Sequence, residues 1–431
     1  MRNKIKFILN LFFTYPHYKM NVFSGTNSFK EVAEAIRSLR GNIVKGDSVE
    51  KYKVAFGREL ASKSVYSFAS GRMGFYSILE SIGIDKGDEI IIPSFTCVVV
   101  PNAIIYSGAS PVYCEVSLND FNIDSSKIVN CITPKTKILY AQHTFGQMCD
   151  MDKIMLIAKK YNLIVIEDCA LSMGAKYKGK FSGTIGDFGY YSSDRSKIIN
   201  TGLGGIVSVN NKKYIKDFQL YYKNIPYLPK KYSKKIVYTF IANIITLHPN
   251  FYWIGKLLNF IFTRLGFMTY FTDELSLKRT EIKKYPYPAK MSNIISMIGL
   301  SQLKFFDKNL NHRKQNALLY NTILNIYTDE YMYSEKNVFL RYSFLVNNRD
   351  YWEQKFSSKI DLSIWFKSVV SGRTKSLESV GYAQGSNRVS EYACDHIINF
   401  PTHMNINVNR ISKLLQELKE SGDIITKERV L

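Results

Sequence analysis

The sequence predicts an α/β protein with a mostly parallel sheet, followed by a smaller α+β domain. From about residue 60 to residue 210, continuous apolar and β-branched runs alternate with segments of helical periodicity. Runs that are apolar at every position are typical of strands covered on both faces, as in parallel sheets with crossover helices. A chain of 431 residues is also too long for one small core. We therefore expect two closely packed domains.

In the first domain, each expected strand is short and apolar and is followed by a helical or turn segment. The expected strands cover residues 89–95, 111–116, 137–140, 163–166 and 206–209. Helices are expected at 72–81 and at 151–160, where Asp150 can cap the first turn. Ligands of such sheets collect at the carboxyl ends of the strands. Asp168 follows such an end.

The pattern of apolar and polar residues changes near residue 290. We predict an N-terminal arm at 1–60, a large domain at 61–290 and a small C-terminal domain at 291–431. The large domain contains a helical, apolar and basic insert at about 213–285. In the small domain the pattern predicts helices at 292–308, 312–327 and 409–418 and strands at 338–346 and 364–370.

The insert contains two apolar stretches, Ile236–Leu247 and Phe251–Phe271. Lys256 and Arg264 interrupt the second stretch, which therefore fits an amphipathic helix better than a transmembrane span. Two interpretations stay open. The insert packs on its own domain or on a dimer partner, or residues 236–271 touch a membrane surface.

The formal net charge of +22 suggests an anionic partner: nucleic acid, a membrane surface or a phosphorylated substrate. The sequence has no paired Cys/His finger, no glycine-aromatic ribonucleoprotein motif and no leucine zipper, which disfavours nucleic acid. Basic residues are instead more frequent towards residues 211–290. We expect no nucleic-acid partner.

The six cysteines form no Cys-x-x-Cys pair, and several stand in apolar runs. This usage predicts reduced thiols in the cytoplasm, without a metal site. Residues 1–14 begin with basic residues and a short apolar stretch, but they lack a long apolar region and a small-residue cleavage site. We expect no signal peptide there, and a short surface-seeking helix is the alternative.

Lys197 carries the strongest chemical signal, because it stands between a Ser-rich stretch and a glycine cluster that ends at Gly205. Pyridoxal phosphate requires a lysine for the Schiff base, a carboxylate for the pyridine nitrogen and donors for the phosphate. Asp168 suits the nitrogen. Gly71 opens a helix whose free N–H groups favour a phosphate. Ser192 or Ser193 can add a hydroxyl. The order and spacing of these residues predict a pyridoxal-phosphate site.

Further motifs extend the pattern along most of the chain. In order they are residues 70–72, 87–96, 108–112, 121–124, 132–137, 143–146, 150–152, 166–170, 183–187, 192–197, 202–205, 290–293, 299–303 and 399–403. With these motifs the chain resembles the DegT/DnrJ/EryC1/StrS sugar aminotransferases, from about residue 60 to 210 and again from 285 to 420. The resemblance implies the pyridoxal-phosphate-dependent transferase fold type I, with a seven-stranded type of sheet between helices.

The resemblance also implies an activity. It points to an aminotransferase that moves nitrogen, usually from glutamate, to a nucleotide-linked keto-sugar for surface polysaccharide or lipopolysaccharide synthesis. It implies a cytoplasmic homodimer, which the insert could bring to the inner face of the membrane. Lys197 would hold the cofactor and move the proton, and Asp168 would pair with the ring nitrogen. The phosphate would lie on Gly71, Arg72 and Ser192.

Four positions depart from the family's pattern. Leu171 replaces a Gln or His near the cofactor's phenolic oxygen, and Cys97 replaces an aromatic residue that stacks on the ring. Pro288 stands where an Asn usually reaches the neighbouring subunit's phosphate, and Arg72 replaces a Thr. The alternatives are a sugar dehydratase or another reaction on a similar sugar, or a silent relative that serves as a membrane-associated scaffold or regulator. Dehydratases of the family carry His at the lysine position, so Lys197 argues against that branch.

Overall fold

The computed structural model describes residues 18–21, 28–270, 286–372 and 376–425. Its centre is a seven-stranded sheet with the strand order β2-β11-β10-β7-β6-β3-β5. The strands are β2 (Val65–Phe68), β3 (Glu89–Pro93), β5 (Ser110–Cys114), β6 (Thr136–Gln142), β7 (Ile164–Asp168), β10 (Phe188–Ser192) and β11 (Gly205–Val209). Only β11 runs antiparallel to its neighbours in this sheet. The predicted, mostly parallel sheet is confirmed.

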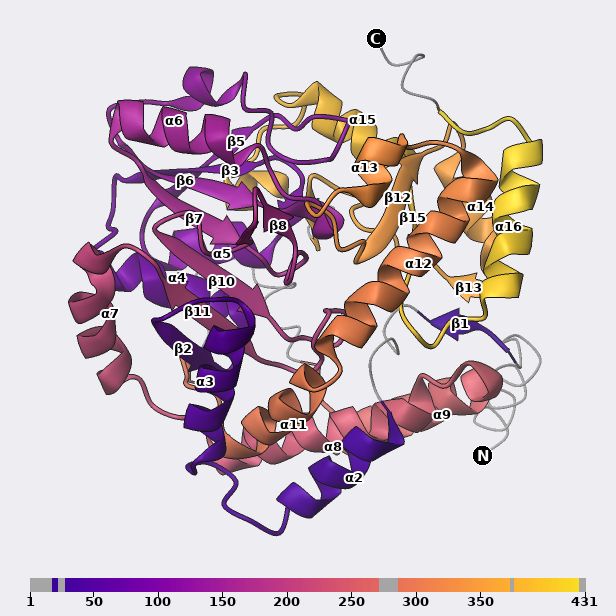
Figure 1. Cartoon of the computed structure of the whole chain (residues 1–431), viewed down its shortest axis with the longest axis horizontal. Coiled ribbons are helices and arrows are strands. Elements are labelled where there is room, and N and C mark those ends of the chain that lie inside the picture. Colours follow the sequence, from indigo (N-terminus) through magenta and orange to yellow (C-terminus); the bar gives the residue numbers. More distant parts are fainter. Residues whose placement is uncertain (1–17, 22–27, 271–285, 373–375, 426–431) are drawn as a thin grey trace.

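The strands form because their apolar runs are covered on both sides. Residues 90–92 of β3 and 138–141 of β6 are fully buried. The helices of this domain are α4 (Gly71–Ser81), α5 (Val99–Tyr106), α6 (Met151–Tyr161) and α7 (Lys212–Asn224). Helix α4 packs on β2, β10 and β11, and α6 packs on β6 and β7 (Figure 1). Asp150 caps α6 as predicted, since its side chain accepts from the Lys153 N–H.

Helices and short strands flank the large sheet. The helices before it are α2 (Phe29–Ser38) and α3 (Ser48–Glu59). Three two-stranded pairs connect segments far apart in the chain or close a loop: β1 (Met20–Asn21) with β13 (Ile360–Asp361), β4 (Thr96–Cys97) with β14 (Val370–Ser371), and β8 (Lys176–Tyr177) with β9 (Lys180–Phe181). The β4–β14 pair brings the C-terminal part of the chain beside the carboxyl edge of the sheet.

The C-terminal part is built on the antiparallel pair β12 (Arg341–Leu345) and β15 (Ile397–Pro401). Its helices are α11 (Asn293–Leu303), α12 (Phe306–Leu324), α13 (Asp329–Tyr333), α14 (Arg349–Phe356), α15 (Arg388–His396) and α16 (Val408–Glu420). Helix α12 packs on α16. Figure 1 shows α12 running from the base of the molecule up to this part.

Two expectations for this part are wrong. The break predicted at 309–311 lies at Lys304 and Phe305, and α12 continues through Asn309. Asn309 is buried, and its amide bonds to the Ile198 carbonyl and to Arg313. Its polarity therefore serves tertiary hydrogen bonds instead of a turn.

The strand predicted at 364–370 is also absent, apart from its last residue in β14. The backbone of Trp365 is held by the side chain of Asn399, through an N–H donated to the amide oxygen and a carbonyl that accepts from the amide nitrogen. Trp365 and Phe366 of this segment line a cavity.

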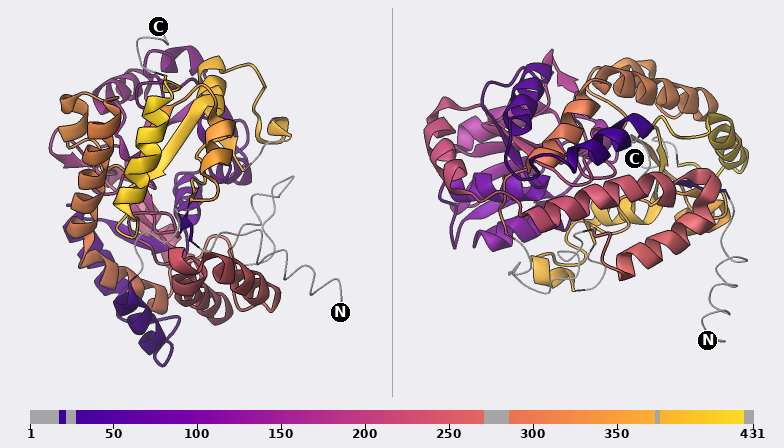
Figure 2. Two further views of the ribbon diagram at one scale, coloured as in Figure 1. Left: turned by 90° about the vertical axis from the view of Figure 1, so that its right-hand side faces the viewer. Right: turned by 90° about the horizontal axis from the view of Figure 1, so that it is seen from below.

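The insert is helical where the structure describes it, in α8 (Lys230–Thr246) and α9 (Tyr252–Arg264). Helix α8 packs on α9, α2 and α11, and Figure 2 shows α8 and α9 side by side along the base of the molecule. Among the described residues, none of the helices has the length and hydropathy to cross a bilayer. The expectations for residues 1–14 and for the end of the insert at 271–285 lie outside the described residues.

No disulfide joins the six cysteines, all of which lie among the described residues. Four of them are buried, at positions 114, 149, 169 and 394.

Candidate active site

A cavity of about 280 Å³ lies at the carboxyl edge of the large sheet. Asp168 ends β7 and Ser192 ends β10, and the Gly71 end of α4 follows β2. The seven residues that the sequence singled out all line this cavity: Gly71, Arg72, Cys97, Asp168, Leu171, Ser192 and Lys197. Parallel strands bring them together because their carboxyl ends meet at one edge.

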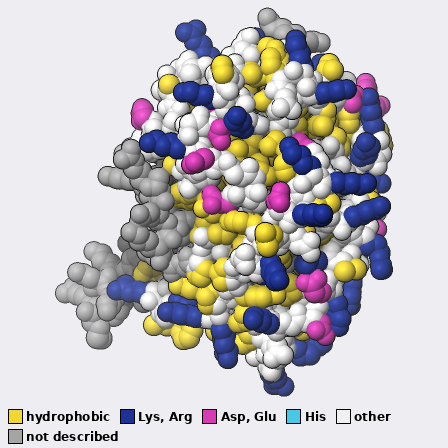
Figure 3. All heavy atoms as spheres, turned by 90° about the vertical axis from the view of Figure 1, so that its left-hand side faces the viewer, with side chains coloured by type: hydrophobic (Ala, Val, Ile, Leu, Met, Phe, Trp, Pro, Cys, Tyr) yellow, Lys and Arg dark blue, Asp and Glu magenta, His cyan; other side chains and the backbone are white. Residues whose placement is uncertain are grey.

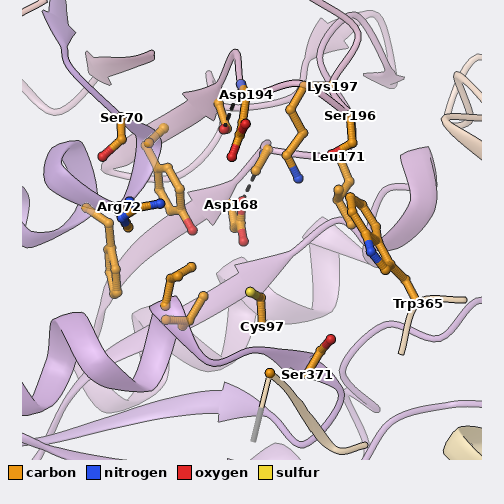
Figure 4. Close-up of a pocket in the computed structure, with 18 of the residues that line it drawn as sticks. Ser70, Arg72, Cys97, Asp168, Leu171, Asp194, Ser196, Lys197, Trp365 and Ser371 are labelled. Carbon is orange, nitrogen blue, oxygen red and sulfur yellow. Dashed lines mark hydrogen bonds between the residues drawn. The ribbon is translucent and has the colours of Figure 1, made fainter. Parts of the chain in front are cut away.

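Lys197 projects its amine into the cavity between Asp168 and Trp365 (Figure 4). Its Nζ lies 4.7 Å from the centroid of the Trp365 ring. Burial lowers the pKa of Lys197, and the carboxylates of Asp194 and Asp168 offset part of that effect. A lysine whose pKa is lowered has a larger neutral fraction near pH 7, and the neutral amine is the nucleophile.

Asp168 is held in place by two donors at the end of β7. Its Oδ1 accepts from the Ala170 N–H at 2.8 Å, and its Oδ2 accepts from the Tyr140 hydroxyl at 2.6 Å. The Tyr140 hydroxyl also bonds to the hydroxyl of Tyr190. Burial raises the pKa of Tyr140 well above its usual value, and the charge of Asp168 raises it further. Tyr140 therefore stays protonated and orients the carboxylate.

The start of α4 lines the cavity through Ser70, Gly71 and Arg72. The Ser70 side chain caps the helix by accepting from the Met73 N–H at 3.3 Å. A Cβ at Gly71 would lie 3.0 Å from the Cβ of Ser192, so only glycine allows β10 to approach the helix this closely. The first N–H groups of a helix and its dipole attract a phosphate.

The structure also separates the two serines that the sequence left as alternatives. Ser192 lines the cavity. Ser193 is buried, and its hydroxyl bonds to the Thr201 hydroxyl at 2.7 Å. Ser193 therefore supports the loop that follows Lys197, by its bond to Thr201. Ser192 is the serine that faces the cavity.

Two of the four positions that depart from the family's pattern, Leu171 and Cys97, add apolar side chains to the wall of the cavity, whereas Pro288 is not among its lining residues. Leu171 and Cys97 both line it, where Figure 4 shows them on different sides of the Lys197 amine. Cys97 lies in β4, which pairs with β14, and this pairing brings Ser371 to the same wall. Neither Leu171 nor Cys97 can supply the strong polar or aromatic contact that a Gln, His or aromatic ring gives.

Sequence reasoning missed several lining residues. Trp365 and Phe366 enter from the C-terminal part, Tyr270 from the insert, and Arg195 from the Lys197 loop. Trp365 lies in segment 364–370, which the sequence predicts to be a strand. Tyr270 ends an apolar stretch that suggested a surface helix. Only the tertiary packing of these segments brings them to the cavity.

Among the described residues, one group has the side chains to hold a metal ion: His143, Glu167 and Cys169. The Glu167 carboxylate already accepts from three backbone N–H groups, of Gly183, Ile185 and Gly186, and from His143. Its charge is therefore satisfied by hydrogen bonds. The group fixes the turn before β10 and carries no sign of a metal centre.

The match to known proteins identifies the family. The model of the DegT/DnrJ/EryC1/StrS aminotransferase family matches residues 24–237 and 263–419, most of the chain. The chain belongs to this family.

Curated relatives match over part of their length. The GDP-perosamine synthase of Caulobacter vibrioides is 39% identical over 166 residues, 38% of this chain and 45% of the relative. The dTDP-3-amino-3,6-dideoxy-alpha-D-galactopyranose transaminase of Aneurinibacillus thermoaerophilus is 40% identical over 165 residues, 38% of this chain and 46% of the relative. The matched region thus spans about half the length of these relatives.

Solved structures agree over nearly the whole chain. The putative sugar aminotransferase Spr1654 from Streptococcus pneumoniae, in its PLP form, has a TM-score of 0.69 at 19% identity, covering 92% of this chain and 98% of that one. DesI in the presence of its TDP-sugar product has a TM-score of 0.70 at 16% identity, covering 96% and 94%. These likenesses confirm the predicted fold.

Proposed function

We propose that this protein is a pyridoxal-phosphate-dependent aminotransferase that moves an amino group, from glutamate, to a nucleotide-linked keto-sugar for surface polysaccharide synthesis. One observation carries the proposal: the Lys197 amine, the Asp168 carboxylate and the start of α4 line the same cavity. Membership of the family and the amino-sugar enzymes among its relatives support the class of substrate.

The side chains of the cavity fit pyridoxal phosphate. Gly71 leaves space against Ser192 that a Cβ would fill, beside the helix N–H groups that bind a phosphate. Asp168 is held by two donors, and a carboxylate keeps the proton on a pyridine nitrogen. Lys197 offers an amine whose pKa is lowered by burial. When bound, the cofactor supplies the electron sink for breaking the bond from Cα to hydrogen.

Each of the lining residues then has a separate role in the proposed reaction. Lys197 would be the residue that attaches the cofactor, and its free amine would move the proton away from the donor's Cα. Tyr140 holds Asp168 in position. Gly71, Arg72 and Ser192 line the part of the cavity where they would hold the phosphate. Leu171, Cys97, Trp365 and Phe366 exclude water from the reacting atoms.

The test begins with the purified protein and added pyridoxal phosphate. Borohydride reduction followed by peptide mass spectrometry should place the cofactor on Lys197, and Lys197→Ala should abolish both the attachment and the visible absorbance. Glutamate should bleach the absorbance of the wild-type protein. Absorbance that is unchanged by glutamate, or by Lys197→Ala, would contradict the proposal and favour a silent scaffold or regulator.

Amination is tested with nucleotide-linked keto-sugars in the presence of labelled glutamate. Transfer of the label to the sugar supports the proposal. Loss of a hydroxyl group from the sugar without uptake of the label would assign a dehydratase.

We further propose a cytoplasmic homodimer with the domain division 1–60, 61–290 and 291–431. Apolar side chains gather between the basic ones on the face shown in Figure 3, which suits burial against a second copy. Light scattering after size exclusion should give twice the 49.6 kDa mass of the chain. A single-chain mass at micromolar concentration would exclude the stable dimer.

We also propose that the insert touches an anionic membrane surface. Phe251, Phe260 and Leu265 are about half exposed or more, and Lys256 and Arg264 lie on the same helix or at its end. Apolar side chains flanked by cations are typical of interfacial helices. Flotation with phosphatidylserine vesicles should carry the wild-type protein upward, and a triple change of Phe251, Phe260 and Leu265 to Ser should abolish it. Equal flotation of both proteins would refute the contact.

A further inference from the structure

The middle of the insert, residues 238–262, lies outside the two segments that match the family's model. The two segments matched to the family end at residue 237 and resume at residue 263. The residues between them include the second half of α8 and most of α9. These helices are nevertheless well packed, because α8 contacts α2, α9 and α11.

After α9 the chain returns to α8, where hydrogen bonds fix residues 269 and 270. The Thr269 N–H donates to the Thr239 hydroxyl at 2.9 Å, and that hydroxyl lies 3.2 Å from the Thr269 carbonyl. The Tyr270 hydroxyl contacts the Asn259 amide of α9 and lies 3.4 Å from the Asn243 amide oxygen of α8. Both insert helices thus hold Tyr270.

Tyr270 is the residue of the insert that lines the cavity. Its ring stacks on the guanidinium of Arg195, 4.1 Å from the ring centroid, and both side chains line the cavity with Lys197. Arg195 lies two residues before Lys197 and contacts the Asp194 carboxylate at 3.5 Å. Arg195 is thus positioned by the insert at the edge of the candidate active site.

Helix α8 also supports the loop that follows Lys197. A Cβ on Gly202 would lie 3.1 Å from Ile236 and 3.5 Å from Phe240, so α8 packs directly on this loop. Ile236 and Phe240 are buried. The insert therefore contacts both sides of the Lys197 segment, through Tyr270 before it and through Gly202 after it.

We propose that Arg195, stacked on Tyr270, binds the diphosphate of the nucleotide-linked substrate, and that the insert is the element that sets this subsite. Among the described lining residues the cations are Arg72, Arg195 and Lys197. In the proposed function Arg72 binds the cofactor's phosphate and Lys197 takes part in the reaction. Arg195 is therefore the cation that remains for the diphosphate of the substrate. Stacking uses the face of a guanidinium, whereas phosphate oxygens approach its N–H edge, so the two contacts are compatible.

This inference rests on the proposed function, because it names the part of the substrate that the insert recognises. The test uses the cofactor-loaded full chain and calorimetric titration with UDP, GDP, CDP and dTDP in turn. Arg195→Gln should weaken the tightest of these complexes by about tenfold to a hundredfold, the range of a lost charge-assisted hydrogen bond. Tyr270→Ala should weaken it as well, and Tyr270→Phe, which keeps the ring, should weaken it less.

Arg264→Gln is the matched control, because it removes the same charge from an exposed position of the insert. The rate of cofactor bleaching by glutamate is measured in every variant, and Arg195→Gln should change it less than it changes nucleotide affinity. The KM for the nucleotide-linked substrate should rise in the same order as the dissociation constants.

Three results would overturn the inference: no binding of any of the four nucleotides by the wild-type protein, unchanged affinity in both Arg195→Gln and Tyr270→Ala, or an equal loss in Arg264→Gln. If the wild-type protein carries its cofactor on Lys197 and reacts with glutamate, such a result refutes this subsite alone. If it does neither, the proposed function itself fails.

Discussion

At the scale of single residues, the chemistry of the cavity depends on how buried groups are paired. Lys197 has a lowered pKa because it is surrounded by protein, while Asp168 is held by Ala170 and Tyr140. The sequence located Lys197 and Asp168 from their spacing. It could not reveal Tyr140, because a tyrosine in an apolar strand predicts core packing until the neighbouring strand is known.

The Tyr140 hydroxyl can be tested by removal. Tyr140→Phe leaves Asp168 with one donor fewer and should slow the bleaching of the cofactor by glutamate about fivefold, the effect of one hydrogen bond of about 1 kcal/mol. Stopped-flow absorbance measures this rate. Tyr320→Phe is the control, since its hydroxyl bonds to the Pro401 carbonyl outside the cavity. Equal slowing in both variants would show that Tyr140 acts through stability alone.

Because the pKa of His403 is lowered in the folded protein, we expect the protein to lose stability in mild acid. The pKa of His403 is lowered from 6.5 to about 3, mainly by burial and in part by the charges of nearby arginines. Below pH 6.5 the unfolded chain therefore binds a proton at His403 that the folded chain does not bind. The free energy of unfolding should fall as the pH drops from 6.5 towards 3, by about 1.4 kcal/mol at pH 5.5.

Urea unfolding at pH 7.5 and pH 5.5 measures this change. His403→Gln should show a smaller loss between the two pH values than the wild-type protein. The comparison uses the change with pH, so it holds even where the variant is less stable at both. A loss of the same size in both proteins would exclude His403 as the cause.

At the scale of elements, the close approach of α4 to β10 shapes the part of the cavity where we propose that the phosphate binds. A Cβ at residue 71 would lie 3.0 Å from Ser192 Cβ and 3.2 Å from the Tyr191 carbonyl. Gly71→Ala should push the helix start away and weaken pyridoxal-phosphate binding about tenfold, as expected for a lost hydrogen bond to a charged group. Fluorescence titration of the apoprotein gives the dissociation constant.

Gly41→Ala is the matched control, because a Cβ there meets only the Ser38 carbonyl, at 3.8 Å. It should leave cofactor affinity unchanged. Cofactor affinity of Gly71→Ala equal to that of the wild-type protein would mean that the phosphate does not lie at the start of α4.

Comparison of the observed with the expected elements shows which helices and strands the periodicity of the sequence predicts correctly. The alternation of strands and helices up to residue 210 was predictable because the strands are covered on both faces and read as uninterrupted apolar runs. The break between α11 and α12 was misplaced because Asn309 is polar yet buried. Strand β10 was not predicted, since its sequence Phe-Gly-Tyr-Tyr-Ser contains a glycine and polar hydroxyls that suggest a turn.

At the scale of the whole molecule, the net charge of +22 should act on charged substrates from a distance. Figure 3 shows lysine and arginine side chains spread over one face among few acidic ones. We expect kcat/KM for the nucleotide-linked sugar to fall several-fold between about 20 mM and 200 mM salt, because the Debye length shortens from roughly 20 Å to below 10 Å. The fall should be smaller for glutamate, which carries less negative charge. Equal salt dependence for both substrates would argue against steering by net charge.

The sequence by itself determined the α/β class, the family resemblance and the positions of Lys197, Asp168 and Gly71. These features depend on local patterns: apolar runs, glycine turns and the spacing of chemical groups along the chain. Only the tertiary structure decided that Ser192 and not Ser193 faces the cavity, and that Trp365 and Tyr270 reach it. The reason is physical, since those contacts join segments up to about 170 residues apart, from Lys197 to Trp365, and they depend on how separate elements pack.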